Sequence, residues 1–150
     1  MAAQLWLLRH GEAVPHAADD ASRELTERGE EQARAVGRAL AAMEMVFHAV
    51  YASPKFRALR TAELACEALG AEPVVHEPLR EGFDVRDARE LLYAGDDQRV
   101  LVVGHNPDLA QVVHDLTGAR VDFKKGAVAG VREPELIALL RPRELARIGA

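Results

Sequence analysis

The chain has 150 residues, the usual size of one domain and enough to bury a single hydrophobic core. Hydrophobic residues make up 49% and charged residues 29%, which is typical of soluble globular proteins and argues against a disordered or fibrous chain. The formal net charge of -5 gives no general attraction to nucleic acid or acidic membranes, so an anion site must come from a local group of arginines and histidines. We expect one domain over residues 1–150 that binds neither nucleic acid nor a membrane.

The chain contains one cysteine, Cys66, so no intrachain disulfide can form and a reducing compartment is the natural expectation. Its apolar neighbours favour a packed thiol over a nucleophile. The N-terminus shows no basic region followed by an apolar stretch, and no apolar run reaches membrane-spanning length. These features predict a cytoplasmic protein.

Short apolar runs alternate with segments of helical spacing along most of the chain. Strands are predicted over residues 5–8, 46–52, 73–76 and 99–103, and helices over 27–43, 53–70, 86–93 and 108–116. Thr26 and Ser53 are the expected N-caps of the first two helices. Residues 127–131 and 136–140 predict a terminal hairpin. The pattern therefore indicates an α/β fold, a three-layer α/β/α sandwich with a mainly parallel central sheet and a C-terminal antiparallel hairpin.

Polar side chains follow three of the predicted strands. Arg9 and His10 come after the first strand, Arg57 after the second and His105 after the fourth. Because binding sites of parallel sheets lie at the carboxyl ends of the strands, we expect these residues to converge on one cleft, with His10 exposed. Arginine offers planar, permanently charged donors, and neutral imidazole can be a nucleophile. The set predicts a phosphoryl pocket that needs no metal.

Four sequence blocks in order resemble the signatures of the histidine phosphatase superfamily, also called phosphoglycerate-mutase-like. The blocks are Leu8-Arg9-His10-Gly11-Glu12-Ala13, Leu25-Thr26-Glu27-Arg28-Gly29, Ser53-Pro54-Lys55-Phe56-Arg57-Ala58 with Thr61, and Val102-Val103-Gly104-His105-Asn106-Pro107. Each block alone is weak, but their ordered occurrence over about three quarters of the chain is specific. Without the long insertions of mutases, the chain is similar to the short SixA-like phosphohistidine phosphatases.

The resemblance implies a role for each matching residue. His10 attacks phosphorus and becomes phosphohistidine, Arg9 and Arg57 clamp the phosphoryl oxygens, and His105 donates to the same oxygens. Water then releases phosphate, with no cofactor or metal ion. Neutral His10 and protonated His105 place opposing demands on pH, so a rate optimum is expected.

Three further positions also follow from the resemblance. Glu81 lies where many relatives place an acidic proton donor, and Arg23 matches an arginine of the short subgroup that faces the pocket. His16 stands where mutase relatives commonly have asparagine, which argues against transferring mutase activity to this chain.

Several residues have simpler interpretations. His105 could cap the helix after Pro107, Arg57 could decorate a helix surface, and helix capping is the preferred role of Ser53. A zinc site from His10, Glu12 and His16 is the rival metal-based hypothesis, but no zinc ligand pattern supports it. Lys124 and Lys125 are candidates for recruiting an acidic partner, although adjacent lysines before a turn are usually just solvated.

The preferred function is removal of phosphate from phosphohistidine in a protein, because a pocket without a capping insertion should admit a histidine presented on another protein. A competing prediction is a general phosphomonoesterase for a small phosphorylated metabolite such as a sugar phosphate, for which Glu81 should matter greatly. A non-catalytic phosphate-binding module is the third possibility. The sequence does not predict the oligomeric state.

Overall fold

A six-stranded sheet forms the centre of the computed structural model, which describes residues 2–150. The strands are β1 (Gln4–Arg9), β2 (Ala49–Ala52), β3 (Pro73–Val75), β4 (Arg99–Gly104), β5 (Val128–Arg132) and β6 (Glu135–Leu140). Their order is β3-β2-β4-β1-β5-β6; the first four are parallel, and β5 runs antiparallel to both β1 and β6. The predicted mainly parallel sheet with a C-terminal hairpin is confirmed.

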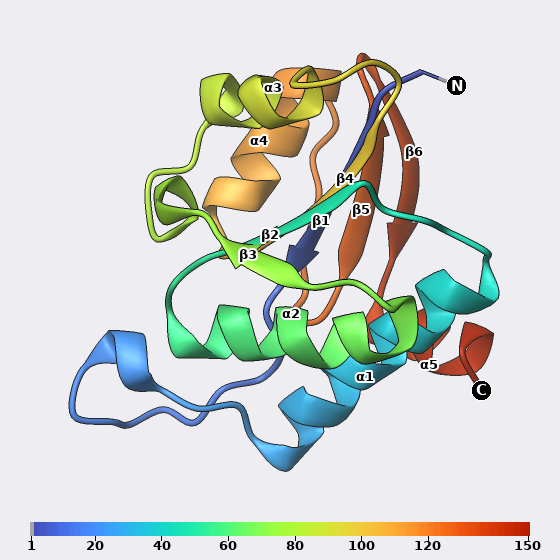
Figure 1. The fold of residues 1–150 in the computed structure, drawn as a ribbon. Coiled ribbons are helices and arrows are strands. Elements are labelled where there is room, and N and C mark those ends of the chain that lie inside the picture. The colour runs from blue at the N-terminus through green and yellow to red at the C-terminus, as the bar shows by residue number, and fades with distance from the viewer. Residues whose placement is uncertain (1) are drawn as a thin grey trace.

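Helices cover both faces of this sheet (Figure 1). On one face lie α1 (Glu27–Ala42), α2 (Phe56–Leu69) and α5 (Pro142–Ile148), and on the other lie α3 (Val85–Leu92) and α4 (Asp108–Thr117). Two short 3-10 helices, η1 (Asp20–Ser22) and η2 (Glu77–Leu79), lie in connecting loops. The molecule is thus the predicted three-layer α/β/α sandwich.

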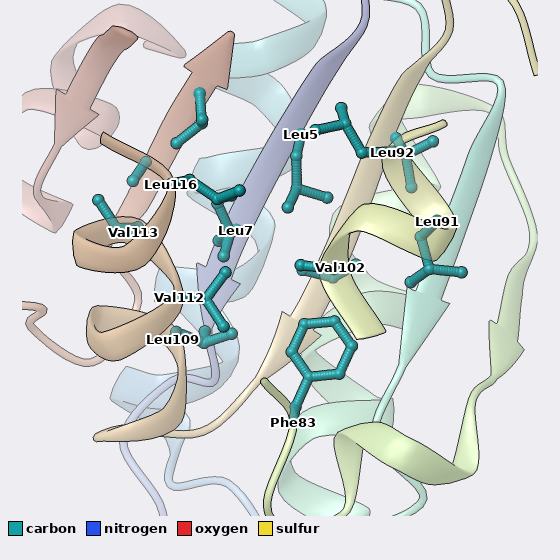
Figure 2. Packing of buried hydrophobic residues seen from close by; sticks show 14 of the residues in the cluster. Leu5, Leu7, Phe83, Leu91, Leu92, Val102, Leu109, Val112, Val113 and Leu116 are labelled. Carbon is teal, nitrogen blue, oxygen red and sulfur yellow. The ribbon is translucent and has the colours of Figure 1, made fainter. Parts of the chain in front are cut away.

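Successive side chains of β1 enter two separate hydrophobic cores. Leu5 and Leu7 pack toward α3 and α4, where Figure 2 shows them beside Leu109, Val112 and other apolar side chains. Trp6 and Leu8 pack on the opposite face, toward α1 and α2. Burial on both faces explains why this strand is a continuous apolar run instead of an alternating one. It also delivers the following residues, Arg9 and His10, to the carboxyl edge of the sheet.

Of the two N-cap residues predicted from the sequence, the structure has one at the predicted position and the other not. Thr26 caps α1, because its side chain accepts a hydrogen bond from the Gly29 amide. Ser53 does not cap α2, which begins only at Phe56 with Lys55 in the N-cap position. The expectation that Ser53 caps this helix is therefore wrong, and its fully buried hydroxyl has a different partner described below.

The C-terminal segment after residue 140, for which the sequence makes no prediction, forms α5. This short helix packs against α1 with Leu145 fully buried. The predicted packed thiol is also observed, since Cys66 is buried and desolvation raises its pKa to about 11. Between residues 2 and 150, no helix has both the length and the apolar character needed to cross a membrane.

Candidate active site

Backbone hydrogen bonds hold His10 at the junction of three strands. Its amide donates to the Gly104 carbonyl at the end of β4, at 3.1 Å, and its own carbonyl accepts from the Gly126 amide just before β5, also at 3.1 Å. The neighbouring Arg9 amide donates to the Ala127 carbonyl. The loop after β1 is therefore tied to both neighbouring strands, so the imidazole starts from a rigid backbone.

Close packing of two glycines fixes the path of the chain after His10. A Cβ on Gly11 would lie 2.5 Å from the Gly29 carbonyl oxygen, and one on Gly29 would lie 1.9 Å from that of Glu12, so both positions need glycine. The Gly11 amide also donates to Thr61 Oγ1 of α2, at 3.1 Å. These contacts join the His10 loop to the start of α1 and to α2.

The imidazole of His10 is buried, with only 6% of the residue exposed, so the expectation of an exposed strand-end side chain is wrong. Its Nδ1 lies 2.7 Å from the Gly11 carbonyl oxygen. Because a carbonyl can only accept, Nδ1 carries the proton and Nε2 is left with a lone pair. Desolvation lowers the pKa of His10 to about 4, and the nearby Arg57 and Arg9 charges add to this lowering. The ring is thus neutral and holds a free basic nitrogen at neutral pH.

His105 faces His10, with the ring centroids 5.3 Å apart. Its Nε2 lies 2.7 Å from Ser53 Oγ, which itself accepts from the Lys55 amide. Desolvation lowers the pKa of His105 to about 3, and the protonated form of His10 and the Arg57 charge lower it further. The structure therefore favours a neutral His105, in contrast to the protonated donor expected from sequence. If the Ser53 hydroxyl donates to Nε2, the single ring proton resides on Nδ1.

Three buried side-chain nitrogens in the described part of the chain lack a hydrogen-bond partner: Arg9 Nε, Arg57 Nε and His105 Nδ1. Buried polar groups are nearly always satisfied, and each orphan needs an explanation. All three belong to neighbours of His10: the charges of Arg9 and Arg57 lower its pKa, and the ring of His105 contacts its ring. Three unused nitrogens around one neutral imidazole suit a ligand with several acceptor oxygens.

The carboxylate of Asp20, a residue with no distinctive pattern around it in the sequence, joins three cations beside this pocket. Asp20 Oδ2 lies 3.2 Å from Arg57 Nη2 and 3.1 Å from Lys55 Nζ, while Oδ1 lies 3.1 Å from Arg23 Nη1. The Asp20 carbonyl also accepts from Arg57 Nη1, at 2.8 Å. Hydrogen bonds from Lys55 and Arg23 hold the pKa of this carboxyl well below its usual range. Asp20 thereby orients the Arg57 guanidinium and connects Arg23 to the site.

The remaining predicted positions lie outside this constellation. Glu81 is exposed in the turn after η2, and no hydrogen bond or ion pair links it to His10, Arg57 or the other described pocket residues. Its role as proton donor stays a prediction. His16 is exposed, and within residues 2–150 no three His, Cys, Asp or Glu side chains lie close enough to hold a metal, so His10, Glu12 and His16 do not form a ligand cluster.

The two lowered pKa values predict that His10 and His105 stay neutral in weak acid. A histidine pKa near the ordinary value of about 6.5 would leave the ring mostly protonated at pH 5, whereas pKa values of about 4 and about 3 leave both rings neutral there. We expect an NMR titration of the ring carbons to show midpoints below pH 5 for these two residues, assigned with single His→Gln variants. A midpoint at or above pH 6 for either ring would contradict the desolvated pocket.

Comparisons with known proteins identify the family of this chain. The family model of the histidine phosphatase superfamily, branch 1, matches residues 5–90. An uncharacterized protein of Picosynechococcus is 32% identical over 139 residues, which are 86% of this chain and 84% of that protein. The solved structure of the protein histidine phosphatase SixA complexed with tungstate is 26% identical, with a TM-score of 0.86 over 95% of this chain and 99% of the other.

A sheet covered by helices on both faces is thus an architecture that this chain shares with solved phosphatases. The chain belongs to the histidine phosphatase superfamily, and within it the chain is SixA-like. The same fold also occurs in a phosphoserine phosphatase from Entamoeba histolytica in complex with 3-phosphoglyceric acid, 17% identical, with a TM-score of 0.76 over 95% of this chain and 98% of that one. Membership predicted from the four sequence blocks is therefore confirmed.

Proposed function

We propose that the chain is a metal-independent phosphatase that forms a phosphohistidine intermediate on His10. The observation that carries this proposal is the set of three unpartnered buried nitrogens, on Arg9, Arg57 and His105, around a neutral imidazole. A phosphoryl group supplies the acceptor oxygens that these nitrogens lack. Phosphoryl transfer depends mainly on positioning and on neutralising charge, and this pocket offers both.

The hydrogen bond of His10 Nδ1 to Gly11 defines which atom attacks. Nε2 holds the lone pair and forms the bond to phosphorus while the bond to the leaving group breaks. Arg9 and Arg57 stabilise charge on the equatorial oxygens, and His105 donates through Nδ1–H while Ser53 donates to its Nε2. Water then attacks phosphorus, the Nε2–phosphorus bond breaks, and phosphate leaves with His10 regenerated. Arg23 assists indirectly by anchoring Asp20, which orients Arg57.

Phosphohistidine in a protein is the substrate that we propose. The likeness to SixA, named a protein histidine phosphatase, supports this choice. Phosphohistidine also has an imidazole leaving group, which departs with less help from an acid than an alkoxide does. This is in keeping with an exposed Glu81 that forms no hydrogen bond or ion pair with the described pocket residues. We further propose that residues 1–150 act as one catalytic domain in the cytoplasm, where buried Cys66 stays reduced.

Trapping of the intermediate tests the covalent mechanism. The chain is mixed with a radiolabelled phosphohistidine protein in the presence of a metal chelator and quenched in alkali, because acid would hydrolyse the phosphoramidate. We expect label on His10 and steady release of inorganic phosphate, with neither signal reduced by the chelator.

The alternatives give different results in the same assay. Loss of turnover in chelator would identify a metal enzyme. If no label transfers but an activated aryl phosphate is hydrolysed, the substrate is a small phosphorylated metabolite, as for a general phosphomonoesterase. If neither compound is turned over, the chain is a non-catalytic phosphate-binding module.

A further inference from the structure

A cavity lies directly beside the catalytic residues, with Arg9 in its wall. Its volume is about 740 Å³, and it is lined by residues of the His10 loop, the start of α1, the loop before β5 and the start of α5. Arg9 and Asn106 belong to its wall, so the cavity begins where the catalytic pocket ends. None of the roles proposed above for the phosphoryl group requires this additional space.

The lining of this cavity is strongly positive in a chain whose net charge is negative. Six cationic side chains line it: Arg9, Arg28, Lys124, Lys125, Arg141 and Arg143. Only two carboxylates lie among them: Glu12, which pairs with Arg28, and Asp122, which pairs with Lys124. From outside the lining, Glu144 pairs with Arg141, just before α5, and with Arg143 of α5. Lys125 forms no ion pair with any described carboxylate, and its positive charge helps to lower the pKa of His10. The lining therefore carries more positive than negative charges, and part of this excess acts on His10.

The exposure of these cations fits a protein partner better than a small ligand. The side chains of Arg28 and Arg143 are each 79% exposed, and those of Lys124 and Arg141 are also more than half exposed. Small-molecule sites are typically enclosed and mostly apolar, with a few fixed polar groups. Exposed charges around a wide opening are instead the means by which protein surfaces steer and orient a partner of opposite charge.

We propose that this cationic cavity is a docking surface for acidic side chains that flank the phosphohistidine on a partner protein. The inference rests on the proposed function and extends it from the phosphoryl group to the surrounding surface. Carboxylates beside the phosphohistidine would lie against Arg28, Lys124 and Arg143 while the phosphoryl group reaches His10. The sequence offers Lys124 and Lys125 as candidates for an acidic partner but favours ordinary solvation, and their place in this lining supports the partner.

Two phosphohistidine peptides of equal length test the proposal, one with Asp and Glu flanking the phosphohistidine and the other with Asn and Gln. We expect the acidic peptide to be turned over with a kcat/KM about tenfold higher, mostly through KM, and the preference to fade at high salt. In the triple variant R28Q/K124Q/R143Q the ratio between the two peptides should fall toward one. Because the readout is a ratio, a general loss of activity does not mimic it.

A matched triple variant, R34Q/R86Q/R132Q, removes the same charge from exposed or half-buried arginines that do not line the cavity. It should keep the preference for the acidic peptide. Equal turnover of both peptides by the native chain, or equal loss of preference in the two triple variants, would overturn the docking surface while leaving the proposed function intact.

A small ligand is the other occupant that the assay can identify. The cavity would belong to a small ligand if the two peptides are not distinguished and a sugar bisphosphate is preferred to its monophosphate. That preference should then require the cavity cations. Hydrolysis of an aryl phosphate without turnover of either peptide would instead overturn the proposed phosphohistidine substrate, and the docking surface with it.

Discussion

His10→Gln is expected to lower kcat by at least about 10⁴-fold with any substrate, because loss of the nucleophile removes the covalent route entirely. The glutamine amide can still donate to the Gly11 carbonyl, as His10 Nδ1 does at 2.7 Å, but it has no ring nitrogen to bond to phosphorus. His10→Ala should be equally inactive and somewhat less stable, since it leaves that carbonyl without its donor and opens a cavity in a buried site. Steady-state kinetics and thermal unfolding measure the two effects separately.

The control for this pair is His114→Gln, which replaces an exposed histidine on α4. It should retain native kinetics and stability. Because His10 is buried, activity must be compared only among variants that fold. A folded His10→Gln variant with more than a few per cent of native turnover would show that His10 is not the nucleophile. Unfolding of both His10 variants at room temperature would indicate a structural residue instead.

The fold was predictable because its central strands, β1 and β4, are buried on both faces. The apolar run of residues 5–8 indicates a doubly covered parallel strand, and the polar residues that follow it mark the carboxyl edge of the sheet. The strand ends alone therefore place Arg9, His10 and His105 close together. The short helix α5 was not predictable, since its formation depends on the packing of Leu145 against α1.

The details of the site depend on tertiary contacts that no local pattern contains. A serine after a strand is compatible with helix capping and with a buried hydrogen bond, and only the fold brings Ser53 to His105. Similarly, Asp20 reaches Arg57 because the loop between β1 and α1 folds back over the start of α2. Asp20 lies three residues from Arg23 but 35 residues from Lys55, so no local sequence pattern contains the whole group. Burial of His10, and with it the lowered pKa, likewise arises from elements distant in sequence.

Arg57→Ala is expected to lower kcat/KM by about 10²- to 10³-fold, in both KM and kcat, because the guanidinium stabilises the phosphoryl group in the ground state and in the transition state. Arg57 is buried and permanently charged, and its Nε is one of the three unpartnered nitrogens. Arg57→Lys keeps the charge but loses the planar fork, so its activity should be intermediate. Inhibition by phosphate should be strongest for the native chain, weaker for Arg57→Lys and weakest for Arg57→Ala.

Arg60→Ala is the matched control on the same helix, since Arg60 pairs with Glu30 and Glu63 and forms no ion pair with Asp20. Its kcat/KM should stay within about threefold of the native value, because exposed ion pairs contribute little. In Arg57→Ala the Asp20 carboxylate keeps Lys55 and Arg23 as partners, so the loop after β1 should remain anchored and the variant should fold, with some loss of stability from the emptied buried site. A near-native kcat/KM for Arg57→Ala would make Arg57 a structural partner of Asp20. An equal loss in Arg60→Ala would attribute the effect to the charge of the helix surface.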